Sequence, residues 1–465
     1  MRAQADRKVI RGWIFYDWAN SVYNLVISSA IFPIFYDNVT TKAFLKNYNA
    51  ANNLNLTEVP ANVDVVVPFF GTQLSPSVLM SFTLSISFLV VSILSPMLSG
   101  IADVTGSKKR FLQFFCYLGA LSCVSLYWFG KAPFEIGMLS VFLASIGFWN
   151  SLVFYNAFLP EIAVPRLHDK ISASGFTMGY LGSMLLLIIC LAIIMGIGPE
   201  YTGVSFILVG VWWVSFSQIT FRRLPNNVYN KAAVPNKLTR GFKELKNVFF
   251  EFNQSKLLKR YLLSFFFFNT GVQTVMLMAV LYAKIEIFSG EYADQATTGL
   301  ILAILLIQLL GAFGAFILSR VSNVLGNIRS LIIAVAIWVL LCLWAYFIQT
   351  PTEFYYLAAG VGLVMGGTQA LARSTYSKML PRTENHASYF SFYDVAEKIG
   401  IVFGTLFFGL MEYLTNDIRS SILSVIFFFS IGLIALFFVP ISNKRNDNDY
   451  DKQLTQDNPT FEFLK

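Results

Sequence analysis

The chain has 465 residues, of which 56% are hydrophobic and only 13% charged, and its mean hydropathy is +0.61. A soluble domain is about one quarter charged, so this composition excludes a soluble globular protein and predicts that lipid surrounds most of the chain. The net charge of +8 favours basic loops on the cytoplasmic side of a membrane over nucleic-acid binding. Backbone groups in lipid must be hydrogen-bonded internally, and apolar stretches without alternation indicate helices.

Twelve membrane-spanning helices are predicted in chain order. The first is a retained helix rather than a cleaved signal peptide, because its apolar run is about 25 residues long and contains polar residues. The expected spans cover roughly residues 12–36, 77–99, 111–129, 135–158, 172–196, 203–221, 260–288, 297–319, 330–349, 354–375, 389–411 and 419–439.

An asymmetry of charge predicts the orientation. With both termini in the cytoplasm, the inner segments hold 28 of the 34 Lys and Arg residues, the outer segments hold 5, and Lys398 alone lies within a span. Positive residues gather in cytoplasmic loops. We therefore expect a multi-pass protein with both termini cytoplasmic, most simply in a bacterial plasma (inner) membrane.

The polar segment between the sixth and seventh spans divides the chain. Residues 238–254 alternate apolar and basic side chains at helical spacing, which is typical of an amphipathic helix lying on a membrane. A docking helix and a linker with a solvated face both fit this pattern. The expected units are a six-helix bundle at 1–221, a cytoplasmic basic linker at 222–259, a second six-helix bundle at 260–440 and a cytoplasmic polar tail at 441–465.

An internal repeat relates the two halves. Residues 99–106 match 319–326 at an offset of 220, and Asp103 falls opposite Asn323. A Tyr-x-x-x-Leu-Pro motif at 155–160 recurs at 376–381, at an offset of 221. Two parallel repeats joined by a cytoplasmic linker are the plan of major facilitators, which bind solute near the midplane between the halves. The predicted fold is therefore all-α, with twelve transmembrane helices in two pseudo-symmetric six-helix bundles.

The loop after the second span carries a predicted gate. It matches the signature pattern G-x-x-x-D-x-x-G-x-[RK]-[RK] of the major facilitators. Asp103 can cap a helix end or pair with a base, which would hold the cytoplasmic side closed until the halves move. An ordinary basic loop is the alternative. The predicted gating residues are Gly100, Asp103, Gly106, Lys108, Lys109 and Arg110.

Polar residues in the first span form another candidate site. Asp17, Asn20 and Asn24 lie at positions i, i+3 and i+7, which places them on one helix face. Polar groups within a span are costly and usually face a cavity or a partner. They are candidates for binding solute or a proton. Alternatively, Asp17 pairs with a loop arginine and has a structural role.

Four motifs carry a family resemblance. They are Tyr-Asp-Trp-Ala-Asn-Ser-x-Tyr at 16–23, Ala-Asp-x-x-Gly-Ser-Lys-Lys-Arg at 102–110, Tyr-Asn-Ala-Phe-Leu-Pro-Glu-Ile-Ala at 155–163 and Gln-Ala-Leu-x-Arg-Ser at 369–374. Together they resemble the vacuole effluxer-like family of the major facilitator superfamily, over nearly the whole chain. The resemblance implies secondary transport, with amino-acid efflux as the activity of the vacuolar relatives. Where that family often has Glu-Phe-Phe-Gly-Phe-Tyr, residues 388–393 read Ser-Tyr-Phe-Ser-Phe-Tyr.

Span eleven contains three charged residues in an apolar run. Asp394 and Lys398 are i,i+4 neighbours and Glu397 adjoins Lys398. Burying each charge costs on the order of 2.5–3.5 kcal/mol unless the charges pair. A carboxylate beside a cavity, with a lysine partner that can release it, suits proton coupling. A fixed ion-pair cluster that stabilises the second half is the alternative.

Uncharged polar residues complete the candidate solute site. Amide and indole groups on the helices expected to line the cavity could hydrogen-bond a zwitterion or a polyol, although such groups also join helices to one another. The candidates for the cavity are Asn20, Asn24, Trp149, Asn150, Asn269, Gln273 and Gln369.

These features predict a secondary active transporter, not an enzyme. The expected partner is a small polar solute such as an amino acid, moved by alternating access with possible proton coupling, and a transporter-like lipid translocator or sensor is the alternative. The chain is expected to be a monomer surrounded by membrane lipids, with no nucleic-acid partner. We expect no metal and no cofactor, because the four cysteines lie in apolar stretches and the two histidines in loops.

Overall fold

The computed structural model describes residues 6–60, 63–231 and 236–440. The first half consists of helices joined by short turns, with one two-stranded hairpin. Its elements are α1 (Arg7–Val22), the π-helical segment η1 (Tyr23–Ala30), α2 (Ile31–Asn52), β1 (Val67–Phe69), β2 (Thr72–Leu74), α3 (Pro76–Thr105), α4 (Lys108–Ser125), η2 (Leu126–Trp128), α5 (Phe134–Asn156), α6 (Leu159–Ile162), α7 (Pro165–Gly196), η3 (Pro199–Tyr201) and α8 (Thr202–Arg223).

The second half follows a separate helix, α9 (Lys237–Gln254). This helix occupies the stretch in which the sequence predicts an amphipathic helix. The remaining elements are α10 (Lys256–Tyr282), the π-helical segment η4 (Ala283–Ile287), η5 (Gly290–Gln295), α11 (Ala296–Leu325), α12 (Asn327–Phe347), α13 (Pro351–Met379), α14 (His386–Thr415) and α15 (Ile418–Phe437).

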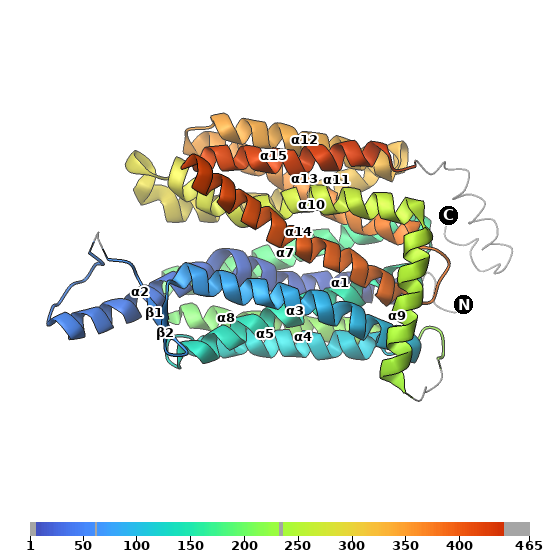
Figure 1. The fold of residues 1–465 in the computed structure, drawn as a ribbon, viewed down its shortest axis with the longest axis horizontal. Helices are drawn as coiled ribbons and strands as arrows, with labels where there is room; N and C mark the ends of the chain where they lie inside the picture. Colours follow the sequence, from blue (N-terminus) through green and yellow to red (C-terminus); the bar gives the residue numbers. More distant parts are fainter. Residues whose placement is uncertain (1–5, 61–62, 232–235, 441–465) are drawn as a thin grey trace.

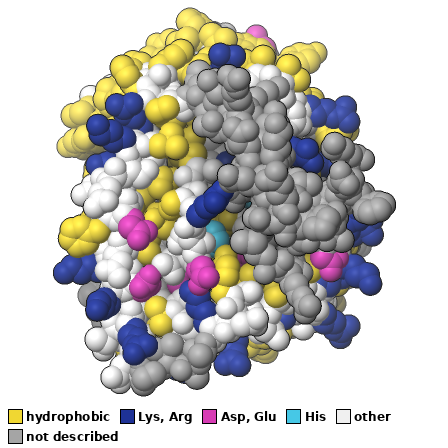
Figure 2. Space-filling view, turned by 90° about the vertical axis from the view of Figure 1, so that its right-hand side faces the viewer, with side chains coloured by type: hydrophobic (Ala, Val, Ile, Leu, Met, Phe, Trp, Pro, Cys, Tyr) yellow, Lys and Arg dark blue, Asp and Glu magenta, His cyan; other side chains and the backbone are white. Residues whose placement is uncertain are grey.

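Two bundles lie side by side, one from each half of the chain (Figure 1). Helix α9 lies across one end of both bundles, and α2 and the β1–β2 hairpin lie at the other end. We call these ends the α9 end and the opposite end. Lys and Arg side chains surround the rim of the α9 end (Figure 2). The twelve-helix major facilitator fold predicted from the sequence is therefore confirmed.

Ten helical segments of the described chain are long and apolar enough to cross a membrane. Helices α13 and α14 are of similar length, 29 and 30 residues, but are more polar. Helix α14 carries the three charged residues noted above, and α13 carries Gln369 and Arg373. Polar side chains of α13 and α14, among them Gln369, Arg373 and Glu397, line the cavity at the centre of the molecule.

The bundles meet along two seams. At the first, α14 packs on α3, and at the second, α7 packs on α11 and α13. Each bundle has its own aromatic core: Trp13 stacks on Tyr155 in the first half, and Trp338 stacks on Phe429 in the second, with ring centroids 4.3 and 5.3 Å apart. Polar groups are concentrated between these cores, at the seams.

Candidate functional site

A central cavity of about 210 Å³ lies between the two halves. One buried water needs only about 10–15 Å³ by the same kind of measure, so the cavity is large enough for a small solute. Its lining mixes apolar residues with polar residues from both halves, a combination that suits a small polar ligand. The polar lining residues are Asp17, Asn20, Ser21, Asn24, Ser29, Asn156, Tyr180, Ser183, Asn269, Gln273, Gln308, Gln369, Arg373, Tyr393 and Glu397.

Most of the predicted cavity residues do line this cavity. From the first half these are Asn20, Asn24 and Trp149, and from the second half Asn269, Gln273 and Gln369. Two of the proton-coupling candidates, Asp17 and Glu397, also line the cavity. Asn150 does not line it: this residue is fully buried, and its amide donates to the carbonyl of Ile146 on the same helix.

Asp17 forms an ion pair across the two halves at the floor of the cavity. Its Oδ2 atom lies 3.0 Å from Nη2 of Arg373, and the same oxygen accepts a hydrogen bond of 2.8 Å from the Tyr155 hydroxyl. Arg373 also donates from Nε to Ser172 Oγ at 2.9 Å and from Nη1 to Asn156 at 3.3 Å. Both charged residues are buried, so they compensate each other's loss of hydration.

Arg373 is a site residue that sequence reasoning missed. Arg373 lies near the end of the expected tenth span, which was placed at residue 375, whereas α13 continues to Met379 and the side chain reaches Asp17. Its guanidinium lies 4.8 Å from the Trp13 ring centroid and 4.3 Å from that of Phe176. Its spacing from Gln369 could have indicated this role, because residues i and i+4 lie on the same face of a helix, and Gln369 was already a candidate for the cavity.

The three charged residues of α14 form one cluster beside the cavity. Lys398 Nζ is completely buried and lies 2.9 Å from Asp394 Oδ1 and 3.2 Å from Glu397 Oε2. Gln273 donates to Glu397 at 2.8 Å. The Lys398 ammonium also lies 3.5 Å from the ring centroid of Trp149, which belongs to the other half. This cation–π contact joins the cluster to the wall of the first bundle.

Asp394 is the least satisfied member of that cluster. Its Oδ1 atom pairs with Lys398, and within the described residues its Oδ2 atom is buried with no hydrogen-bond partner. Glu397 lines the cavity, whereas Asp394 and Lys398 lie behind it. The cluster therefore has one carboxylate open to the cavity and one behind it, with a single lysine between them.

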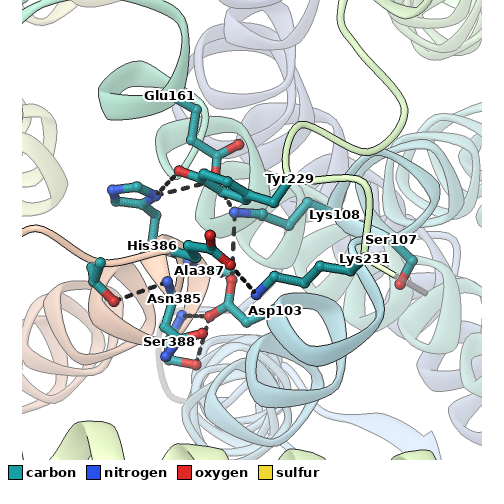
Figure 3. Close-up of polar contacts among 12 residues, drawn as sticks. Asp103, Ser107, Lys108, Glu161, Tyr229, Lys231, Asn385, His386, Ala387 and Ser388 are labelled. Atoms are coloured by element: carbon teal, nitrogen blue, oxygen red, sulfur yellow. Dashed lines mark hydrogen bonds and ion pairs between the residues drawn. The ribbon is translucent and has the colours of Figure 1, made fainter. Parts of the chain in front are cut away.

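The predicted gating loop closes the first seam at the α9 end. Asp103 Oδ2 accepts hydrogen bonds from the backbone N–H and the hydroxyl of Ser388, both at 2.7 Å, and Oδ1 accepts from the N–H of Ala387 at 3.2 Å (Figure 3). These N–H groups belong to the first turn of α14, where backbone N–H groups have no hydrogen-bond acceptor within the helix. A buried acid of the first half thus caps a helix of the second half.

A second set of charges surrounds this cap. Lys108 pairs with both Asp103, at 3.5 Å, and Glu161, and His386 Nδ1 lies 3.1 Å from Glu161 (Figure 3). The Tyr229 hydroxyl reaches the same imidazole at 3.3 Å. Because His386 begins α14 and the other charged residues belong to the first half, this network also crosses the seam.

The remaining gating residues position the loop. Gly106 ends α3 in the left-handed region at φ 65°, a conformation that glycine adopts without strain. Gly100 lies against the backbone of Gly241 in α9, where any side chain would collide. Lys109 donates to the carbonyl of Leu224 at 2.8 Å, and Arg110 is exposed.

The second seam is closed by a different acid. Asp169, at the start of α7, accepts hydrogen bonds from Ser322 at 3.1 Å and from Asn327 at 2.8 Å, and its Oδ2 atom lies 2.6 Å from Lys378 Nζ. All three partners belong to the second half. Further along α7, Thr177 donates to the carbonyl of Ala312.

Among the described residues, the contacts that close the seams lie toward the α9 end of the cavity. The hydrogen bonds that α7 makes to the second half come from residues 169–183, which lie in the part of α7 nearest the α9 end. The cavity lining continues beyond them, to Leu25 and Ser29 in η1 and to Ala279 and Val280 in α10. Contacts between the halves are thus concentrated at the α9 end and at the cavity floor.

The same architecture occurs in solved transporters. The human organic anion transporter MFSD10 (TETRAN) aligns at a TM-score of 0.67 with 12% identity, covering 92% of this chain and 99% of that one. The transporter FucP in the outward conformation aligns at 0.61 with 14% identity, covering 94% and 99%. These likenesses show that the chain has the major facilitator fold, with a cavity between its two halves.

The chain belongs to the family described as "Vacuole effluxer Atg22 like", whose model matches residues 5–449. This confirms the resemblance in the four motifs. An uncharacterized MFS-type transporter of Bacillus subtilis, YxiO, is 29% identical over 94% of this chain and 97% of its own length. Autophagy-related protein 22-1 of Penicillium rubens is 22% identical over 94% and 89%.

Proposed function

We propose that the protein is a secondary active transporter that carries a small polar solute, an amino acid or a similar metabolite, by alternating access. The central cavity carries this proposal, because both halves contribute polar groups to it. Asp17 and Arg373 lie at its floor, and Glu397 and Gln273 lie on the second half. A zwitterion has one carboxylate and one ammonium group, which these charges complement, while amides such as Asn20 supply neutral hydrogen bonds.

The proposed orientation places the α9 end in the cytoplasm, because this end carries the basic rim (Figure 2). The structure is then an outward-facing state, closed at the cytoplasmic seams. Inward opening requires Asp103 to release α14 and Asp169 to release the loop between α11 and α12. The proposed location is a bacterial plasma membrane, and the proposed working unit is a monomer.

Proton coupling is proposed to act through the cluster on α14. Protonation of Asp394 would remove its charge and leave Lys398 paired with Glu397 alone. The ammonium would then shift toward the cavity, where the solute and Trp149 compete for it. Solute binding and proton binding would be linked through one lysine, which can satisfy only some of these partners at a time.

A ligand screen followed by a transport assay tests the proposal. The purified protein is first screened by thermal shift against amino acids, sugars and nucleosides, since a ligand at 100 times its Kd adds about 2.7 kcal/mol of stability. Uptake of the best ligand is then measured in proteoliposomes with and without an imposed pH gradient. We expect uptake by the wild-type protein to rise with the gradient.

Two variants sharpen that assay. Asp394→Asn should abolish the response to the pH gradient while the protein still folds and binds ligand. Glu412→Gln removes an acid from the same helix outside the central cavity and should behave like the wild type. A normal pH response in Asp394→Asn would disprove the coupling. Transbilayer movement of a fluorescent lipid, with no solute uptake, would favour the alternative of a lipid translocator.

A further inference from the structure

Helix α9 has one face packed on the transporter. Gly241 lies against Gly100 and Ile101 of α3, and Val248 is buried. The two acids of α9 also bind the second half: Glu244 accepts a hydrogen bond from Asn385 at 2.6 Å, and Glu251 accepts one from the Tyr389 hydroxyl at 3.0 Å. The helix therefore bridges α3 and the start of α14, and both of its negative charges are used in that contact.

A second face of α9 is apolar and largely exposed. Leu238, Phe242 and Phe249 are 65%, 46% and 54% exposed, and at 100° per residue they lie within about 40° of one another. Phe249 also makes an edge contact with the ring of Phe392 in α14. Large apolar side chains rarely form such a row in water. This row adjoins the packed face, and α9 lies at the level where the membrane-spanning helices end (Figure 1).

A third face is basic. Arg240, Lys243 and Lys246 are exposed and follow the apolar row around the helix, and in the part of the chain that the structure describes their side chains form no ion pair or hydrogen bond. Other Lys and Arg side chains surround the same end (Figure 2). Packed, apolar and basic faces therefore succeed one another around a single helix.

We propose that α9 is a docking surface for anionic phospholipids of the membrane that the protein spans. An interfacial helix buries its apolar row among acyl chains near the headgroups and holds its basic residues at the phosphates. The order of the three faces allows both contacts while the packed face stays on α3. A soluble acidic protein would be attracted by the basic face but would leave the exposed Leu238 and Phe242 uncovered.

A lipid titration tests this proposal. The detergent-solubilised full chain is titrated with phosphatidylglycerol or phosphatidylcholine, and the thermal unfolding midpoint is recorded. We expect the midpoint to rise with phosphatidylglycerol only. In the triple variant Arg240→Gln, Lys243→Gln, Lys246→Gln, the concentration for half the effect should increase roughly tenfold to a hundredfold, given the contribution of each basic residue near an anionic surface.

Matched controls distinguish lipid binding at α9 from an effect of the protein's net charge. The variant Lys42→Gln, Lys46→Gln, Lys284→Gln removes the same charge from exposed positions in α2 and η4 and should respond like the wild type. Leu238→Ser with Phe242→Ser should weaken the lipid response without changing the midpoint in detergent alone, because both side chains are exposed.

Three results would overturn the proposal. The first is an equal loss of response in the control with Lys42, Lys46 and Lys284 replaced, which would show an effect of net charge only. The second is an equal rise with glycerol phosphate, which would show a site for a soluble anion. The third is a wild-type protein that does not distinguish the two lipids.

Discussion

Both seams are closed at the α9 end by a buried carboxylate, but the carboxylate comes from a different position in each. At the seam of α3 and α14, Asp103 follows the second span and reaches across to the first turn of α14. At the seam of α7 and α11, Asp169 starts the fifth span and receives Ser322 and Asn327 from the loop region of the other half. The first half supplies the acid at both seams.

This difference shows how the repeat has diverged. The repeat partner of Asp103 is Asn323, which is exposed, so the second loop has lost the acid and its neighbours act as donors to Asp169 instead. The two seams also differ in their contact with α9. Helix α9 lies over α3 and α14, so the seam that it bridges has an additional connection that must move before it opens.

The largest expected effect comes from Arg373→Leu, at the inner end of the second seam. It leaves Asp17 buried without its partner, which should cost about 3–5 kcal/mol of unfolding free energy, seen as a large fall in the thermal unfolding midpoint. Asp17→Leu combined with Arg373→Leu should recover part of the loss, because no charge is then unpaired. A double variant less stable than either single one would contradict this reasoning.

Asp103→Asn and Asp169→Asn compare the two seams directly. Each variant loses a charged acceptor for buried donors, which should cost about 1.5–3 kcal/mol. Thiol labelling reports the opening: Ser95→Cys is placed beside Asp394 at the first seam, and Ala173→Cys is buried at the second. The natural cysteines are buried and give little background.

Each acid variant is expected to raise labelling most at its own seam. Equal labelling of both reporters in both variants would show that the seams open as one unit. In that case the seams would differ in the residues that close them but would open together.

Gly100→Val tests the extra connection at the first seam. The added side chain collides with the backbone of Gly241 and should displace α9 at a cost of about 1–3 kcal/mol. Labelling at position 95 should rise while labelling at position 173 stays unchanged. A Gly100→Ala variant, with a smaller clash, should fall between this variant and the wild type.

Asn323→Asp should have the smallest effect. It restores the acid that the repeat predicts at this position, but the side chain is exposed, and such surface changes are usually within about 0.5 kcal/mol. Unchanged labelling at both seams is the expected result. A marked stabilisation would mean that Asn323 faces the seam in another state of the protein.

Hydrophobicity, charge bias and the repeat were enough to predict twelve helices in two bundles, because span length and polarity are local properties of a sequence. Cavity residues such as Asn20 and Gln273 were also predictable, since a polar group in an apolar run needs a polar environment. Asn150 shows the limit: on α5 it lies next to Trp149 in sequence but points elsewhere, and only packing decides which of two neighbours faces the cavity.

Partners across the halves could not be predicted from one sequence. Asp17 and Arg373 are separated by 356 residues, and Asp103 and Ser388 by 285. Nothing local in either segment specifies its partner. Asp169 gave no motif at all, because its function at the seam depends on where α11 and α12 place their polar ends.

The π-helical segment η1 has a consequence for how the first span tolerates length changes. Its backbone hydrogen bonds close one residue further back than in an α-helix, and it begins at Tyr23, beside the cavity-lining Asn24. Removing one residue between 23 and 30 would let the wide turn revert to regular α-helix. Asp17 and Asn20 lie before this segment, so their positions in the cavity would not change. The loss of one residue would be taken up within the wide turn, and α2 would keep its orientation. A single-residue deletion here should therefore be tolerated far better than one at Trp13.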